Sequence, residues 1–313
     1  MAWLGARQSV AFAFAVTLMP PPSDVKCPPD TKRREASAKR GEREEWCERP
    51  DGLRDGPYRL VNADQGYGER REEGQYRRGE KQGEWRVTWG PNPPSITTFR
   101  HGIEEGPASS RYRDGSLDER WSMKRGKRTG PYEKWNSQGR LSVRTHLVND
   151  RENGRYQEWD DAGGVCDDGM YRLGSKLGRW IECKDLGGLR GRGSYEGGLR
   201  EGVWLFSLHD GTPTARGRYH RGKRDGTWTF FWDDGKTTAS RGSYRRGLRQ
   251  GRWTTFGRRG DRDATVDCRR GEARSGGSWE PAYLICRGKD DRERAFDPYG
   301  AEIEAALDDD EPP

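Results

Sequence analysis

Glycine and aromatic residues recur at a fixed interval along the 313-residue chain, separated by stretches that are mostly polar. The glycines of this series are Gly56, Gly83, Gly106, Gly130, Gly154, Gly178, Gly202, Gly226, Gly251 and Gly277. The steps between them are 23 to 27 residues, and the second residue after each glycine is Tyr or Trp, except at Ala108. A period of this length predicts a repeat array.

One repeat, residues 202–225, has the pattern of two strands and two turns. Residues 203–206 are apolar and aromatic, and Asp210 and Gly211 form a hairpin turn signal. A second turn is expected at residues 222–226, so that glycine supplies φ > 0 at both corners. We therefore predict an all-β protein in which about ten antiparallel hairpins form an elongated, twisted, single-layer sheet or solenoid over residues 46–280.

A further glycine recurs two residues before a tyrosine. The pairs are Gly169 and Tyr171, Gly193 and Tyr195, Gly217 and Tyr219, and Gly242 and Tyr244. Because the glycine carries no side chain, we expect a ring from the adjacent strand to lie flat against it.

The phased rings form a candidate aromatic ladder along the array. Its residues are Trp85, Tyr132, Trp135, Tyr156, Trp159, Trp180, Trp204, Trp228 and Trp253. Two interpretations remain open. The rings are either the thin core itself or a partly open stripe that binds a protein, a peptide or a glycan. Tyr132 and Trp135 are three residues apart, so both faces of a strand carry rings unless a bulge intervenes.

Basic residues concentrate at predicted turns, which we expect to align along one edge as a basic rim. Its residues are Lys124, Arg125, Lys127, Arg128, Lys223, Arg224, Arg245, Arg246 and Arg249. Such a rim suits anionic headgroups or an acidic partner, and the alternative is that it provides solubility and blocks strand edges. Nucleic acid is disfavoured because glutamates such as Glu104 and Glu201 interrupt the rim.

Six cysteines occur as neighbours along the chain: Cys27, Cys47, Cys166, Cys183, Cys268 and Cys286. Residues equidistant from a hairpin turn face each other, so we predict Cys166–Cys183 and Cys268–Cys286 as cross-strand disulfides and Cys27–Cys47 as a bridge at the entry. The alternative is six reduced thiols in the cytoplasm. The spacing does not suit zinc, and we expect no metal.

The two ends differ from the array. Residues 1–19 have the features of an export signal, in which Arg7 precedes the apolar run of residues 10–19. Residues 20–45 are rich in proline and charge and indicate a flexible linker. Residues 281–313 are expected to be a C-terminal cap and a short acidic tail.

The stretch Tyr-x-x-Gly-x-x-x-Gly-x-Trp/Tyr resembles the MORN repeat in its bacterial variant of about 24 residues. It occurs from Tyr76 to Trp85 and from Tyr171 to Trp180, and three more copies begin at Tyr195, Tyr219 and Tyr244. The resemblance covers residues 50–280 and implies a platform of β-hairpins. In that family, such platforms are associated with protein scaffolding, membrane phospholipids or antitoxin roles.

No sequence pattern for catalysis stands out. Phosphate-binding loops and nucleophile elbows are absent from the sequence, and carboxylate pairs such as Asp160 and Asp161 lie at predicted turns. We expect no enzyme activity and no cofactor. The predicted function is a non-catalytic, protein-binding scaffold exported to a bacterial envelope. The alternatives are peripheral binding of anionic membrane, an antitoxin or immunity protein, and a binder of cell-wall glycan.

Overall fold

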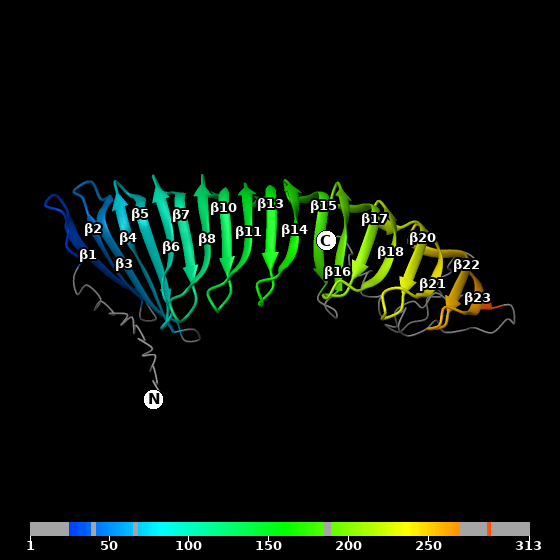
Figure 1. Cartoon of the computed structure of the whole chain (residues 1–313). Helices are drawn as coiled ribbons and strands as arrows, with labels where there is room; N and C mark the ends of the chain where they lie inside the picture. The colour runs from blue at the N-terminus through cyan, green and yellow to red at the C-terminus, as the bar shows by residue number, and fades with distance from the viewer. Residues whose placement is uncertain (1–24, 39–41, 65–67, 185–188, 269–286, 289–313) are drawn as a thin grey trace, which may run out of the picture. The chain divides into compact units, whose positions relative to one another are not determined.

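The computed structural model describes residues 25–38, 42–64, 68–184, 189–268 and 287–288 (Figure 1). These residues form β-strands joined by turns and contain no helix, so none of them belongs to a helix able to cross a membrane. The all-β class and the antiparallel hairpin repeats are therefore confirmed. The expected leader, the tenth glycine Gly277 and the acidic tail lie outside the described residues.

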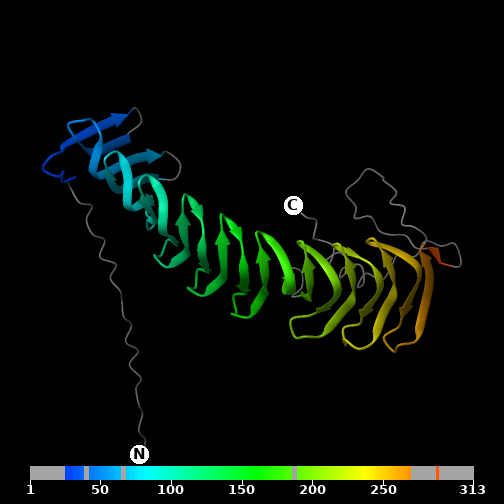
Figure 2. The same ribbon diagram turned by 90° about the horizontal axis from the view of Figure 1, so that it is seen from above.

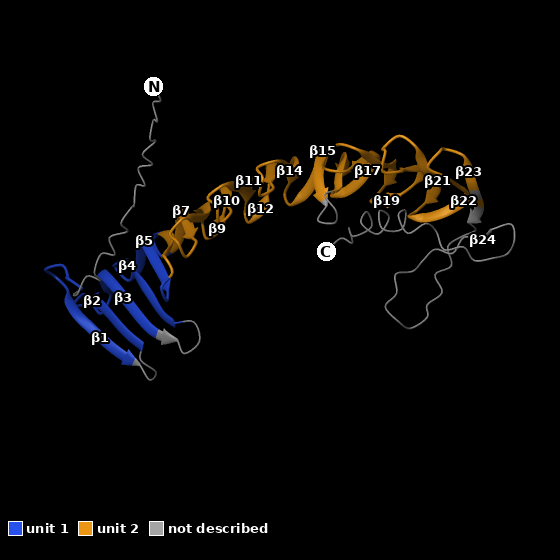
Figure 3. Cartoon of the chain, turned by 60° about the horizontal axis from the view of Figure 1, so that its bottom comes forward, with its two compact units in different colours: residues 1–91, 99–102 blue, residues 92–98, 103–313 orange. Residues whose placement is uncertain are grey.

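The chain divides into two compact units, coloured separately in Figure 3. Unit 1 is residues 1–91 and 99–102, and unit 2 is residues 92–98 and 103–313. Unit 1 contains β1 (Lys32–Ala38), β2 (Glu42–Glu48), β3 (Arg54–Asp64), β4 (Gly68–Arg77) and β5 (Glu80–Trp89), while β6 (Ser95–Arg100) has residues in both units. Within unit 1, β1 to β5 pair antiparallel in chain order.

Unit 2 repeats the same pairing over a longer series of strands, which Figure 2 shows as hairpins stacked side by side. Its strands are β7 (Ile103–Arg111), β8 (Leu117–Lys124), β9 (Lys127–Arg128), β10 (Gly130–Trp135), β11 (Leu141–Val148), β12 (Arg151–Glu152), β13 (Gly154–Trp159), β14 (Val165–Arg172), β15 (Ser175–Lys184), β16 (Leu189–Glu196), β17 (Leu199–Ser207), β18 (Pro213–His220), β19 (Lys223–Arg224), β20 (Gly226–Phe231), β21 (Thr238–Arg245), β22 (Leu248–Phe256), β23 (Arg262–Cys268) and β24 (Arg287–Gly288). Successive strands pair antiparallel. The short strands β9, β12 and β19 are first segments of interrupted strands that continue as β10, β13 and β20, and each pair of segments shares one partner: β8, β11 and β18.

The tight turn of each repeat lies earlier than the sequence indicated. In the repeat predicted to turn at residues 222–226, the two central residues are Arg221 (φ 50°) and Gly222 (φ 77°). Two consecutive residues with φ > 0 define the type I′ turn that matches the twist of a hairpin. Lys223 and Arg224 already belong to β19, so the predicted turn position was wrong by about two residues.

The phased glycines serve a purpose other than turning the chain. Gly202 has φ 74° but lies inside β17, next to a register shift in the pairing of β16 with β17. Arg192 pairs with Leu205, whereas Ser194 pairs with Glu201. The prediction of glycine corners was therefore wrong for this series, because these glycines form β-bulges that accept φ > 0 at low cost.

The second glycine series confirms the expected ring packing. A methyl group added at Gly217 would overlap the Trp228 ring, and the same holds for the other members of this series. The pairs of glycine and covering ring are Gly74 and Trp85, Gly169 and Trp180, Gly193 and Trp204, Gly217 and Trp228, and Gly242 and Trp253. A tyrosine then meets each ring edge-on, as Tyr219 does at 5.2 Å between centroids and 86° between planes.

A cation also lies close to each of these five tryptophan rings. The distances to the ring centroid are 4.0 Å for Lys81 on Trp85, 4.5 Å for Lys176 on Trp180, 4.5 Å for Arg200 on Trp204, 5.0 Å for Arg224 on Trp228 and 4.5 Å for Arg249 on Trp253. Each cation stands four residues before its tryptophan, so the cation–π contact is local and repeats with the array. At Ala108, where no ring is present, the corresponding position is Glu104.

Successive repeats are also joined at their tight turns. The Gly222 N–H donates to the Arg200 carbonyl at 2.9 Å, and the Gly247 N–H donates to the Arg224 carbonyl at 2.8 Å. Next to them, the Arg221 N–H donates to Oε2 of Glu201 at 2.9 Å. Each turn therefore satisfies backbone groups of its neighbour, as the stacking of repeats requires.

The segment predicted to be a linker, residues 20–45, contains strand residues at Lys32–Ala38 and from Glu42. Strand β1 and the start of β2 occupy it, so the linker prediction was wrong for these residues. The predicted disulfide at the start of the array, Cys27–Cys47, is present, and the predicted disulfide Cys166–Cys183 is also present. Cys268 ends β23, but Cys286 lies outside the described residues, so the predicted Cys268–Cys286 bridge stays a prediction.

Reduction of these two disulfides should destabilise the protein without abolishing the array. Their sequence separations are 20 and 17 residues, and loops of this length correspond to about 3 kcal/mol of stabilisation each through the unfolded chain. We expect a lower midpoint of urea unfolding in reducing buffer, with strand content retained before the transition in circular dichroism. An unchanged midpoint would mean that the bridges do not form in solution. The Cys166→Ser and Cys183→Ser double variant separates the contribution of the second bridge from the first.

Candidate binding surface

The predicted aromatic ladder is mainly the core of the protein. Its five tryptophans at the cation-covered positions are at most 2% exposed. They are Trp85, Trp180, Trp204, Trp228 and Trp253. The accessible-stripe interpretation was therefore wrong for these residues, since a ring between a glycine, a tyrosine and a cation has no free face.

The remaining four ladder residues, Tyr132, Trp135, Tyr156 and Trp159, are half-buried. The register shifts between Lys134 and Trp135 in the pairing of β10 with β11, so the bulge considered in the sequence analysis is present. The pairing of β13 with β14 also shifts before Trp159. These rings lie in the part of unit 2 where tyrosine replaces the buried tryptophan.

The predicted basic rim divides into two groups. Seven of its nine residues are exposed: Lys124, Arg125, Lys127, Arg128, Lys223, Arg245 and Arg246. Arg224 and Arg249 are only 3% exposed and lie on tryptophan rings. The rim prediction was wrong for these two residues, because alternation along the strand directs Lys223 outward and Arg224 inward.

A buried ionic cluster lies on the core side of β15 to β17. The Glu182 carboxylate accepts from Arg200 Nη2 at 2.8 Å, from Lys176 Nζ at 2.5 Å and from the Tyr195 hydroxyl at 2.5 Å. Burial acts to raise the pKa of Glu182, but the two cations and the hydrogen bonds outweigh it and hold the pKa at about 2. Glu182 and Arg200 are buried while Lys176 is partly exposed, so removal of one partner would leave an uncompensated charge in the core.

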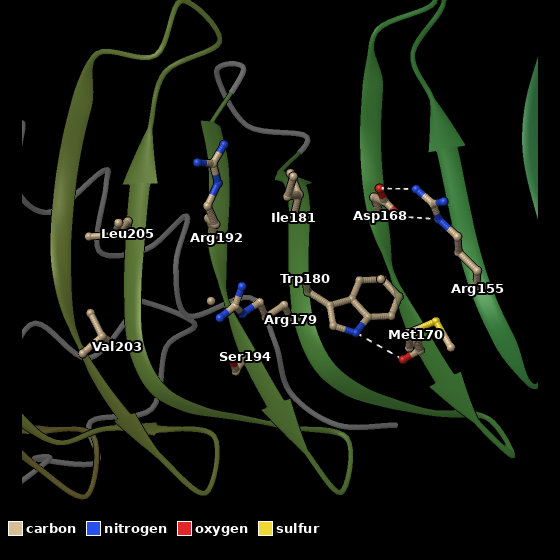
Figure 4. Close-up of a pocket in the computed structure, with 12 residues that line it drawn as sticks. Arg155, Asp168, Met170, Arg179, Trp180, Ile181, Arg192, Ser194, Val203 and Leu205 are labelled. Carbon is tan, nitrogen blue, oxygen red and sulfur yellow. Dashed lines mark hydrogen bonds and ion pairs between the residues drawn. The ribbon is translucent and has the colours of Figure 1, made fainter.

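The opposite face of the same sheet is open. Met170, Val203 and Leu205 are 47%, 65% and 51% exposed. Together with Ile181, they line a groove of about 570 Å³ on β13 to β17, which Figure 4 shows with its surrounding arginines. We call this feature the apolar groove. Exposed apolar side chains grouped in one concave surface indicate a binding site.

A row of arginines starts at the edge of this groove and crosses the sheet. The residues follow one another by direct pairing from strand to strand, in the order Ile181, Arg192, Leu205, Arg216, Thr229, Arg241 and Thr254. Arg192, Arg216 and Arg241, which we call the arginine row, are exposed. In the described part of the chain, none of the three forms an ion pair with a carboxylate.

Two earlier repeats carry arginine at the same position, Arg120 and Arg144, but neutralise it, and the repeat before Arg192 carries Asp168 there. Arg120 and Arg144 both bind Glu133, at 2.5 Å and 3.1 Å, and Arg155 binds Asp168. Among the described residues, Arg192, Arg216 and Arg241 have no such acid, because Ile181, Leu205 and Thr229 take the position of Glu133.

The arginine row was not predicted from the sequence, although its spacing is visible there. Arg192, Arg216 and Arg241 are separated by 24 and 25 residues, as the glycines are. The basic residues at the turns are adjacent in sequence and therefore easy to recognise. The residues of the arginine row become neighbours only when the strands pair.

The open face has the chemistry of a binding surface. Guanidinium groups bind carboxylates or other oxyanions, and the groove provides apolar contact area. No three metal-ligating side chains come together among the described residues. A comparison with models of known protein families gives no match, and a comparison with curated proteins gives none either. The resemblance to the MORN repeat therefore stays a prediction from the motif.

Proposed function

We propose that this protein is a non-catalytic platform that binds another protein through the open face of unit 2. The observation that carries the proposal is the arginine row, three exposed arginines that form no ion pair with a carboxylate of the described residues, next to the apolar groove. Charged side chains together with exposed apolar area are typical of protein-binding surfaces, where charge gives specificity and buried apolar contacts give affinity. The partner surface should be acidic.

The architecture supports a binding role. Aromatic rings and buried cations of the core occupy one face of the sheet, and the hairpin turns join the repeats, so the open face is presented on a rigid support. A preformed surface loses little conformational entropy on binding. The two disulfides fit an oxidising compartment, and we place the platform at a bacterial envelope on that ground together with the export-signal pattern of residues 1–19.

Affinity capture with substituted baits tests the proposed function. The baits are the full chain, a variant with Arg192→Glu, Arg216→Glu and Arg241→Glu, and a matched variant with Arg120→Glu and Arg144→Glu. The control arginines occupy the same repeat position but are already paired with Glu133. We expect a protein enriched by the full chain and by the control bait to be lost from the arginine-row variant.

A comparison of the three baits with an unrelated basic protein separates specific binding from non-specific electrostatic attraction. Circular dichroism and unfolding midpoints must show that all three baits are folded. Equal enrichment on all baits, or no protein enriched over an unrelated basic bait, would overturn a function that acts through this face.

A further inference from the structure

The spacing of the arginine row defines the kind of segment that can bind it. Arg192, Arg216 and Arg241 lie on β16, β18 and β21, and each pair is separated by one intervening strand in the sheet. Neighbouring strands are about 4.8 Å apart, so the arginines recur about every 9.6 Å across the strands. A ligand that binds all three must present anionic groups at this interval on one side.

Among regular peptide conformations, polyproline II fits this interval best. It has three residues per turn and rises about 3.1 Å per residue, so every third side chain lies on one face at intervals of about 9.3 Å. A β-strand places same-side residues about 6.7 Å or about 13 Å apart, and neither value matches. In an α-helix, the nearest equivalent is every seventh residue at about 10.5 Å, and the mismatch grows with each arginine.

The apolar residue between the first two arginines favours a peptide over an inorganic polyanion, whereas Thr229, between Arg216 and Arg241, is buried. Leu205 stands between Arg192 and Arg216 and is 51% exposed, and it also lines the apolar groove. In a polyproline II segment, two of every three residues are free to be proline or another apolar residue. Such segments bind shallow apolar surfaces with little loss of conformational entropy, because the helix is preformed.

From these features, we infer that the open face of unit 2 binds an extended acidic segment of a partner protein in the polyproline II conformation. Its carboxylates stand at every third residue and pair with Arg192, Arg216 and Arg241. Its apolar residues contact Leu205 and continue into the apolar groove beside Val203. Seven residues, with acids at positions one, four and seven, span the arginine row. This inference rests on the proposed function and specifies the partner.

Synthetic peptides of equal composition test the spacing directly. The probe is a fluorescein-labelled (Glu-Pro-Pro)5 peptide. Its control contains the same five glutamates and ten prolines, with glutamates alternately two and four residues apart, so that the charges fall on different faces. We expect fluorescence anisotropy with the full chain to give an affinity for the probe about tenfold higher than for the control, decreasing as salt is added.

Substitutions then locate the site. We expect Arg216→Gln to weaken probe binding about threefold, and the triple change of Arg192, Arg216 and Arg241 to Gln to weaken it about thirtyfold. The matched control, Arg120→Gln with Arg144→Gln, should leave the affinity unchanged. Circular dichroism of each variant confirms that the sheet is intact.

Other outcomes have defined meanings. Equal binding of both peptides would overturn the period-three segment, and so would stronger binding of a helical peptide with glutamate at every seventh residue. Tighter binding of inorganic polyphosphate or of an acidic polysaccharide at equal charge would assign the surface to a different polymer. If the peptides fail while capture of a protein still depends on the arginine row, the segment is wrong and the proposed function stands. If capture is also independent of the row, both fail.

Discussion

Replacing Gly217 with alanine is expected to destabilise the protein by about 3 kcal/mol, because the added methyl group overlaps the Trp228 ring. That ring has no room to move. It is fully buried, its Nε1–H donates to the Arg218 carbonyl at 3.0 Å, and Tyr219 meets it edge-on at 5.2 Å. Arg224 lies 5.0 Å from its centroid. Relief of the overlap would require this whole arrangement to shift.

A double-mutant cycle isolates the contact between Gly217 and Trp228. Trp228→Ala alone should cost about 3–5 kcal/mol, since it leaves a cavity in the core. In that background the Gly217→Ala methyl group has space, so its additional cost should fall well below its cost in the unsubstituted protein. Urea unfolding followed by circular dichroism measures all four proteins, with exposed Thr227→Ala as a control. Additive costs would mean that the ring does not lie on this glycine.

The ring-and-glycine packing could be predicted from sequence because it depends only on residues at fixed separations. Gly217 stands two residues before Tyr219, and an aromatic run begins at Trp228 in the next strand. Any antiparallel pairing that buries the ring needs a bare position opposite it. The period thus determined the unit of packing without knowledge of the turn type.

The basic residues illustrate what the period alone does not determine. Lys223 is exposed and Arg224 is buried, although they are adjacent. The side of the sheet that each side chain occupies depends on where the strand starts, and a shift of one residue reverses it. The β-bulge at Gly226 changes the register once more. The face of the sheet that Lys223 and Arg224 each occupy therefore depends on the position of the turn, which lies at Arg221 and Gly222.

The linker prediction for the N-terminal strands was wrong for a different reason. Strands β1 and β2 are highly charged, without the apolar alternation that marks a half-buried strand. Their charges pair across the two strands, as Arg34 does with Glu48 at 3.0 Å and Arg33 with Glu45 at 3.3 Å. Cross-strand pairs of opposite charge stabilise a polar ribbon. The same composition in an isolated sequence indicates a linker, because the pairing partner is not visible.

The candidate binding surface follows from the same physics as the core. In the later repeats of unit 2, buried tryptophans occupy one face of the sheet, so alternation leaves the other face free of packing constraints. On that face, Arg144 and Arg120 share Glu133, whereas Arg192 and Arg216 flank Leu205. Loss of the intervening acid changes the surface from neutral to cationic without changing the fold. This explains why the arginine row lies in the later repeats.

The buried cluster around Glu182 should make the protein sensitive to acid. Its pKa is about 2 in the folded state, against an ordinary value of 4.5, because the cations Arg200 and Lys176 outweigh the effect of burial. The stabilisation of about 3 kcal/mol implied by this shift is fully present above about pH 4.5. It is lost progressively as the pH falls from 4.5 towards 2, since the unfolded chain takes up the proton first.

Asp167, on the neighbouring strand β14, should change the stability of the protein with pH in the opposite direction, and over a higher pH range. Burial raises its pKa to about 6, although the carboxylate accepts from the Cys183 N–H at 2.9 Å. The folded protein therefore takes up a proton before the unfolded chain does, and stability rises as the pH falls from about 6 towards its ordinary value of 3.8. The two carboxyl groups together predict maximal stability near pH 4 to 5, from the pKa values of both.

Urea unfolding at several pH values, applied to the unsubstituted protein and two variants, measures both effects. Glu182→Gln should cost about 3–5 kcal/mol at pH 7, because Arg200 is left in the core without its carboxylate. The difference from the unsubstituted protein should shrink below pH 4.5. Asp167→Asn should remove the rise between pH 6 and 4, so its difference curve has the opposite slope. A Glu182→Gln difference that stays constant from pH 7 to 3 would contradict the depressed pKa, and therefore the ionic cluster that Glu182 forms with Arg200 and Lys176.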